Sequence, residues 1–419
     1  MTKDIYKTSR ICYIIEETTA YLITFLITGA YLAKLTLSLG FSDSLTALLG
    51  SFVNLGCVFQ LFAIAIFRRG SAKRKLTILY TINELLFALL YLVPFLNINS
   101  SVKTALFIAF LLGGYFIFNT VSSPKTNMFM ALIPDNRRGT FTAYKEAISL
   151  VSGVAFRFSM GLLIDYFNSR GNMIAAFITC GVTIVALMIM HTLSLIFAKE
   201  KDLGQVDSGS VLNGIKEVIF DKRIAPILII SIMWTTCNAI CTPFLGTYQV
   251  KELGFSMTYV AVLSAINAGV RIIASVFLGR YADKNSFAKM LKICYGLVAL
   301  SFVAITFTTP ANGYLTYMIY EIFMAAAMGG INSAEINLIF DYAIPEKRKN
   351  ALSVKYAFCG VCGFFATLAV TPLVNYIQRS GNRIFGVPIY AQQILSLVSL
   401  TLSIVLILFI DKVVIRKNK

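Results

Sequence analysis

Two short stretches of the chain recur in the same order, far apart in the sequence. Residues 133–138 read IPDNRR and residues 344–349 read IPEKRK, and each copy lies between two long apolar runs. Just before them, SPKTN at residues 123–127 is answered by SAEIN at residues 333–337. Because both pairs run in the same direction, the repeat predicts two halves built on one plan.

The composition predicts that this plan is a membrane protein. Hydrophobic residues make up 57% of the 419 residues, charged residues only 14%, and the mean hydropathy is +0.76. Soluble domains carry about 25% charged residues. A helix needs about 20 apolar residues to cross a bilayer core about 30 Å thick, and the apolar runs here reach that length. The short alternating segments of a membrane β-barrel are not the pattern of this chain.

The fold class expected is therefore an all-α membrane protein with twelve transmembrane helices in two parallel-related six-helix bundles. Residues 1–198 form the N-terminal bundle, residues 199–222 a cytoplasmic linker and residues 223–419 the C-terminal bundle. Parallel repeats of this kind are typical of membrane proteins whose halves rock around a site between them. The expected spans are 11–39, 43–67, 74–96, 103–132, 140–167, 171–197, 223–250, 256–282, 286–309, 313–343, 349–377 and 386–410.

The basic residues predict the orientation of these spans. Lys and Arg gather in the segments that are cytoplasmic if the N-terminus is cytoplasmic, most densely in residues 68–75. We therefore expect a multi-pass protein of the cell membrane with both termini in the cytoplasm. The net charge of +17 then reflects the topology of the chain rather than a nucleic-acid-binding surface. Anionic lipid at the cytoplasmic face of the bilayer is the expected counter-charge.

The sequence carries no motif of an enzyme, a metal site or a cofactor site. Cys359 and Cys362 have the spacing of a redox pair but lie in an apolar run without a strand–helix context. The single histidine, His191, cannot build a metal site and is interpreted as structural. No nucleophile triad and no phosphate-binding glycine loop are present. We expect a monomer that is not an enzyme, with no metal and no cofactor.

Residues 279–284 (GRYADK), between the eighth and ninth expected spans, resemble the cytoplasmic loop motif of the major facilitator superfamily. The twelve spans and the central linker are similar to that family as well. In the family the glycine permits close helix approach, and the acid and bases brace the closed inner gate. The first-half copy keeps two bases but has Ala63 and Phe67 where glycine and aspartate are usual. The gating residues that the resemblance implies are Gly279, Asp283, Lys284, Arg68 and Arg69.

The fifth expected span departs from one branch of that family. Drug–proton antiporters usually carry a Gly-x-x-x-Gly-Pro-x-x-Gly-Gly pattern there. Residues 153–161 read GVAFRFSMG instead, with no proline and with an arginine in the middle. This absence disfavours multidrug efflux.

Charged residues inside the spans are the candidate functional residues, because each costs about 2.5–3.5 kcal/mol at the bilayer centre on insertion scales. Lys125 and Glu335 occupy matching frames of the two halves, in spans that line the cavity in the resembling family. We interpret them as functional. Glu16 and Glu84 are better explained as structural residues, each paired with a cation so that it holds two helices together. The further candidates of this kind are Glu17, Lys355, and the asparagines of the repeated frames, Asn127 and Asn337.

Arginines and hydroxyl groups indicate the kind of solute. Arg271 lies deep in the eighth span and Arg157 in the fifth, and a guanidinium group binds a carboxylate or phosphate with two hydrogen bonds. Arg271 needs a partner, which is a ligand or an acid such as Glu321 or Glu335. Tyr21 in the first span and Asn238 in the seventh add groups that suit a hydroxylated or zwitterionic solute.

The function predicted is a secondary active transporter that moves a small polar or anionic organic solute by symport with H⁺ or Na⁺. Glu335 and Glu17 are the candidates to carry a proton. Two alternatives stay open: a proton-coupled efflux antiporter for drugs or metabolites, and a membrane receptor or lipid-moving protein that transports no solute. The absence of any large segment outside the membrane disfavours the receptor.

The topology yields a direct test with single cysteines in a background from which the eight native cysteines are removed. A cysteine at Lys73 should react with a membrane-impermeant reagent only from the cytoplasmic side. Cysteines at Lys103 and Arg170 should react only from outside, because they lie in the opposite set of loops. Labelling of all three from one side would contradict the expected orientation.

Overall fold

The computed structural model describes residues 6–56, 66–67, 71–130, 132–133, 138–200, 218–343, 345–384 and 386–415. These residues divide into two compact units. The first unit comprises Met1–Phe41, Gly56–Asp207 and Ser256–Ala261, and the second comprises Ser42–Leu55, Ser208–Phe255 and Val262–Lys419. The expected bundle boundaries at residues 198 and 223 stay a prediction, and residues 201–217 of the linker lie outside the described residues.

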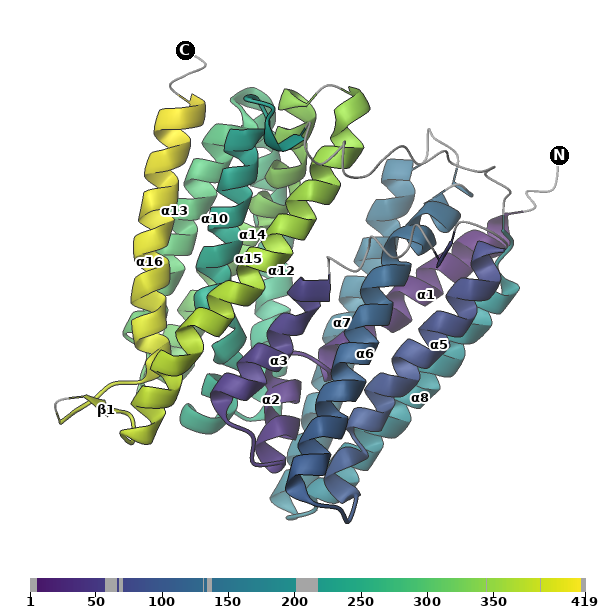
Figure 1. The fold of residues 1–419 in the computed structure, drawn as a ribbon, viewed down its shortest axis with the longest axis vertical. Coiled ribbons are helices and arrows are strands. Elements are labelled where there is room, and N and C mark those ends of the chain that lie inside the picture. The colour runs from purple at the N-terminus through teal and green to yellow at the C-terminus, as the bar shows by residue number, and fades with distance from the viewer. Residues whose placement is uncertain are drawn as a thin grey trace. The chain divides into compact units, whose positions relative to one another are not determined.

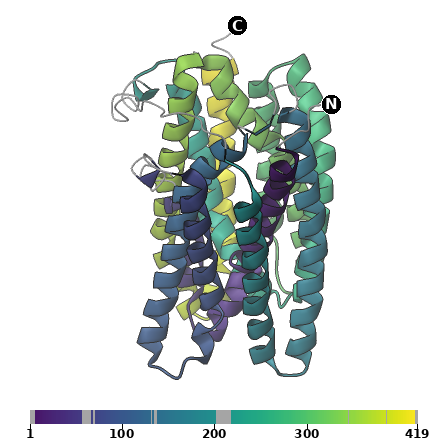
Figure 2. The ribbon, with the colours of Figure 1, turned by 90° about the vertical axis from the view of Figure 1, so that its right-hand side faces the viewer.

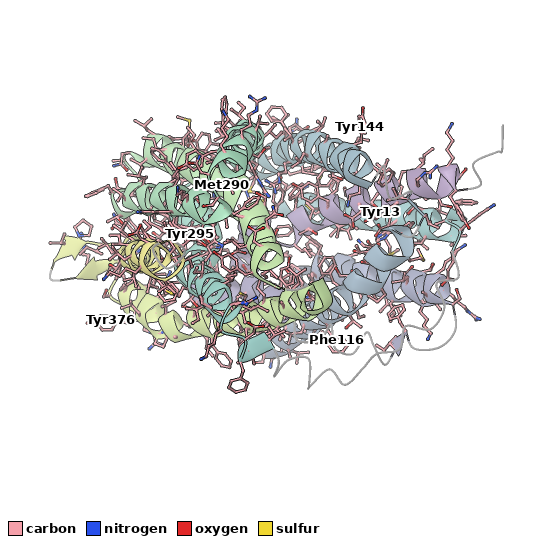
Figure 3. All side chains as sticks on the ribbon, turned by 90° about the horizontal axis from the view of Figure 1, so that it is seen from above. Tyr13, Phe116, Tyr144, Met290, Tyr295 and Tyr376 are labelled. Carbon is pink, nitrogen blue, oxygen red and sulfur yellow. The ribbon has the colours of Figure 1, made fainter. Side chains whose placement is uncertain are left out.

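The first unit is a bundle of long helices (Figure 1). Short loops join α5 to α6 and α7 to α8 at one end of the bundle (Figure 2). The helices are α1 (Lys7–Leu26), α2 (Gly29–Ser38), α5 (Ala72–Leu90), α6 (Ser100–Met130), α7 (Arg138–Ser169) and α8 (Met173–Phe197). Buried aromatic rings pack between them, and Tyr13 stacks on Phe129 with ring centroids 4.5 Å apart (Figure 3).

The second unit contains the remaining helices and one small hairpin. Its helices are α3 (Asp43–Leu55), α10 (Ala225–Cys241), α11 (Leu245–Thr247), α12 (Met257–Lys284), α13 (Phe287–Thr306), α14 (Gly313–Tyr342), α15 (Pro345–Arg379) and α16 (Ala391–Ile410). The antiparallel strands β1 (Arg383–Ile384) and β2 (Val387–Pro388) lie between α15 and α16. Met290 and Tyr295 are fully buried in α13, whereas Tyr376 of α15 is exposed (Figure 3).

The helices confirm the predicted all-α membrane class. Within the described ranges, nine helices are long and apolar enough to cross a membrane, and α1 with α2 makes a tenth if the pair is one span. The nine match the fourth to twelfth expected spans. The second and third expected spans contain α3 and α5, and residues 57–65 of the second lie outside the described residues.

The first expected span, residues 11–39, is not one straight helix. It is broken between α1 and α2, whose axes differ by 44°. Thr28 is extended, and Gly29 has a φ of +55°, a conformation that other residues rarely adopt. The span also begins earlier than expected, at Lys7. The seventh expected span changes its helix type near its end, where Pro243 lies in a 3₁₀ turn (Thr242–Phe244) after α10 and a π-helical turn (Tyr248–Glu252) follows.

The first turn of α12 belongs to the first unit, and two side chains satisfy its backbone donors. Asp165 of α7 accepts hydrogen bonds from the N–H groups of Met257 (2.9 Å) and Thr258 (2.7 Å). Ser256 accepts one from the N–H of Tyr259 at 3.1 Å. Helix N-termini present free N–H groups and a partial positive charge, so a carboxylate is the favoured partner there.

Replacing Asp165 by alanine should therefore destabilise the protein by about 1 kcal/mol, the typical cost of a lost helix cap. Asp165→Asn keeps one acceptor oxygen. The thermal unfolding temperature of this variant in detergent should therefore lie between those of Asp165→Ala and the wild type. Asn168→Ala, one turn further along α7, is the matched control. An Asp165→Ala variant that unfolds with the wild type would show that the cap contributes nothing.

Candidate functional site

A buried lysine from α6 meets two acids from α1 inside the first unit. Lys125 is only 5% exposed, and its Nζ lies 2.6 Å from Glu17 Oε1 and 3.1 Å from Glu16 Oε1. Glu16 has no exposed surface at all. A charge in such surroundings is tolerated only when it is paired and hydrogen-bonded, and each acid here pairs with Lys125 through one of its oxygens.

A second lysine approaches the same acids from α7. Lys145 Nζ lies 2.9 Å from Glu17 Oε2, so each oxygen of Glu17 binds a different lysine. The Lys145 ammonium also lies over the ring of Tyr13, 4.9 Å from the ring centroid, which favours a cation. We refer to Glu16, Glu17, Lys125 and Lys145 as the first-unit charge cluster. The cluster ties α1 to α6 and α7.

His191 extends this cluster to α5 and α8. Its Nε2 lies 2.9 Å from Glu16 Oε1, and its Nδ1 contacts Glu84 Oε1. His191 is fully buried and Glu84 is 2% exposed. From the sequence, Glu16, Glu84 and His191 were interpreted as structural residues. Their one signal was that all three are polar residues in apolar runs, at similar depths in three spans.

The second unit holds a simpler pair. Glu335 of α14 accepts a hydrogen bond from Lys355 of α15, with Lys355 Nζ 2.7 Å from Glu335 Oε2. Lys355 is 4% exposed. Among the described residues, the other oxygen of Glu335 has no hydrogen-bond partner. Such an oxygen is free to accept a proton or a donor group of a ligand.

The repeated frames thus place one charge of each half in an ion contact, and Lys125 is buried whereas Glu335 is partly buried. Lys125 and Glu335 hold corresponding positions, with opposite sign and with partners in their own units. Asn337 is partly buried, and the side chain of Asn127 lies outside the described part of the structure. That the two clusters face one shared cavity stays a prediction.

The two arginines differ in their surroundings. Arg157 stacks on Phe25, with its guanidinium carbon 3.4 Å from the ring centroid. Arg271 is exposed, and of its two suggested partners Glu321 accepts from Asn267 and Glu335 from Lys355. A pairing of Arg271 with either acid stays a prediction. A role of Arg271 in binding an anionic solute stays a prediction.

The remaining candidates are polar groups and the cytoplasmic loop. Tyr21 is partly buried against Phe25, and Asn238 accepts a hydrogen bond from Thr242 at 2.7 Å. A Cβ atom at Gly279 would meet no described atom within 4 Å, and Lys284 is exposed at the end of α12. Arg68, Arg69 and the side chain of Asp283 lie outside the described residues. The gating role of these residues stays a prediction.

Comparison of the sequence with known families gives a match over most of the chain. The model of the Major Facilitator Superfamily matches residues 17–367. No curated protein matches the chain.

Solved structures share the fold over nearly the whole chain. The nucleoside transporter NupG is 13% identical, with a TM-score of 0.73 over 97% of this chain and 98% of that chain. A D-xylose-proton symporter is 14% identical, with a TM-score of 0.70 over 97% and 98%. A bacterial homologue of the iron transporter ferroportin in an inward-facing state is 13% identical, with a TM-score of 0.70 over 98% of both chains. At these identities the likeness shows the fold alone.

The buried pair of the second unit should behave as a unit in a double-mutant cycle. Lys355→Met leaves a buried carboxylate unpaired and should destabilise the protein by about 3 kcal/mol. Adding Glu335→Gln to that variant removes the unpaired charge, so the double variant should be more stable than the single one. Thermal unfolding in detergent measures both, with Tyr356→Phe as a control at the exposed neighbour. If the loss of stability in the double variant equalled the sum of the losses in the two single variants, the pairing of Glu335 with Lys355 would be contradicted.

Proposed function

The chain belongs to the Major Facilitator Superfamily, and on this premise we propose that it is a symporter for a small polar or anionic organic solute. In this proposal the two bundles alternate the access of one binding site, and a gradient of H⁺ or Na⁺ drives uptake. The protein acts as a monomer in the cell membrane, with both termini in the cytoplasm.

The observation that carries the proposal is the pair of ion clusters at matching positions of the repeat. Charges inside a membrane helix are costly and mark ion or substrate pathways in transporters. Lys125 lies in the fourth expected span and pairs with Glu16 and Glu17. Glu335 lies in the tenth expected span and pairs with Lys355. A helix tie alone does not require a charge at this position of both halves, because an apolar contact of equal volume would hold the helices as well.

The polar groups of the units support the class of solute. Thr18 and Ser149 bond to each other at 3.0 Å, and Asn238 and Thr242 do so in the second unit. Hydroxyl and amide groups of this kind exchange readily for the hydroxyl groups of a ligand. Two solved structures of the same fold are a nucleoside transporter and a D-xylose-proton symporter, and both names refer to hydroxylated compounds. Arg157 and Arg271 would add affinity for an anionic group.

The acids supply the groups for coupling. Glu17 holds two lysines, and Glu335 has one oxygen bonded to Lys355 and one without a partner among the described residues. Protonation of either acid would release its lysine. Such a change of partner links the binding of an ion to a rearrangement of helices.

Counterflow in proteoliposomes tests the proposal. Vesicles loaded with pooled sugars, nucleosides, amino acids and organic acids should exchange at least one labelled member of the pool. Lys125→Met and Glu335→Gln should each abolish this exchange, because each breaks the cluster of its unit. Thr126→Val, at the exposed position after Lys125, is the matched control.

Insertion and thermal stability of the variants are measured alongside. Wild-type exchange by both well-inserted variants would make the two clusters helix ties only. A wild-type protein that exchanges no member of the pool would reject the proposed class of solute.

A further inference from the structure

His191 lies between two acids, and this geometry restricts its protonation. Glu16 Oε1 faces one ring nitrogen and Glu84 Oε1 faces the other. A neutral imidazole has one N–H donor and one acceptor, whereas a carboxylate only accepts. If both acids were ionised, a neutral ring would turn a lone pair toward a carboxylate oxygen. The arrangement is satisfied when both ring nitrogens carry a proton and both donate.

The charges around His191 give the same result. The ring, carried by α8, packs against α1 and α5, and the titratable groups that contact it among the described residues are Glu16, Glu84 and the tilted ring of Tyr80, with centroids 4.7 Å apart. One step further lie the other members of the first-unit charge cluster, namely Lys125, Glu17 and Lys145. Three carboxylates and two ammonium groups leave one net negative charge. One proton on His191 makes the whole group neutral.

Burial shows that this proton matters. Glu16 and His191 have no exposed surface, so a net charge there cannot be relieved by water. Glu16 Oε2 and Glu84 Oε2 are buried and have no hydrogen-bond partner among the described residues. They are further acceptors for a proton that enters or leaves. A Na⁺ ion suits the group poorly, because the imidazole lies where the ion would need oxygen ligands.

We propose that Glu16, His191 and Glu84 form the binding site of a coupling proton, set behind Lys125 within the first unit. The proposal rests on the proposed function and names the coupling ion and its residues. Protonation forms one N–H bond on the His191 ring with a proton taken from water on one side of the membrane. Release breaks that bond and returns the proton to water on the other side.

The protonation of His191 affects the rest of the charge cluster through one shared atom, Glu16 Oε1. Glu16 Oε1 accepts both from His191 Nε2 at 2.9 Å and from Lys125 Nζ at 3.1 Å. When the ring loses its proton, Glu16 keeps Lys125 as its only cationic partner. Lys125 is then drawn toward Glu16 and away from Glu17. Glu17 and Lys145 thereby become available to a polar solute.

The single histidine of the chain permits a test that needs no solute. In protein labelled with ¹⁵N-histidine, every ring signal belongs to His191. Solid-state NMR of the full chain in lipid at neutral pH should show two protonated ring nitrogens, and the second proton should be lost as the pH rises. Glu84→Gln offers an amide that can donate to Nδ1, so this variant should show a neutral ring with Nε2–H. A neutral wild-type ring from mildly acidic to mildly alkaline pH would overturn the site.

Transport then tests whether the proton is coupled. The readout is the ratio of uptake driven by an inside-alkaline pH gradient to counterflow, with the solute that wild type exchanges in the screen. His191→Gln should lose the pH-driven part of this ratio, and Thr192→Val, the next residue of α8, should keep it. An unchanged ratio in His191→Gln would reject the coupling role. A protonated ring in a protein that exchanges no solute would also reject coupling, and it would reject the proposed function separately from the proton site.

Discussion

Glu16 Oε1 is the atom on which the first unit depends most. It lies 3.1 Å from Lys125 Nζ of α6 and 2.9 Å from His191 Nε2 of α8, on a residue of α1 without any exposed surface. Glu84 ties α5 to the same histidine, and Glu17 ties α7 through Lys145. An unpaired charge at the membrane centre costs about 2.5–3.5 kcal/mol, so helix positions that separate these groups are disfavoured. The requirement to pair every charge thus fixes the register of five helices.

The architecture followed from patterns that act locally or repeat. The long apolar runs specify helices of membrane length. Pro243, which lacks an N–H donor, lies in a 3₁₀ turn, whereas Pro124 and Pro372 lie inside α6 and α15. The bend at Thr28 and Gly29 was missed. A glycine in an apolar run is common in membrane helices, and only its positive φ, which depends on tertiary packing, makes it a break.

The candidate site was predictable only in part, for a physical reason. The cost of a buried charge identified Lys125, Glu17, Glu335 and Lys355 from sequence, because that cost depends on depth in one span. The partners depend on the rotation and packing of several helices, which no short pattern encodes. His191 therefore looked like an isolated histidine, although it bonds to Glu84, 107 residues away, and to Glu16, 175 residues away. The partner of Arg271 depends in the same way on helix packing, and its pairing with Glu321 or Glu335 stays a prediction.

The repeat also explains why the two ion clusters differ. Aligning YLAK at residues 31–34 with YQVK at residues 248–251 brings Glu17-Thr18-Thr19 onto Trp234-Thr235-Thr236. The first unit has an acid on this helix and a lysine in the SPKTN frame. The second has a buried tryptophan packed near Tyr295, with ring centroids 5.7 Å apart, and an apolar ring cannot neutralise a buried lysine. The SAEIN frame accordingly carries an acid, which takes its cation from α15. The opposite signs of Lys125 and Glu335 thus match the partners within each unit, because α1 offers two acids to Lys125 and α15 offers a lysine to Glu335.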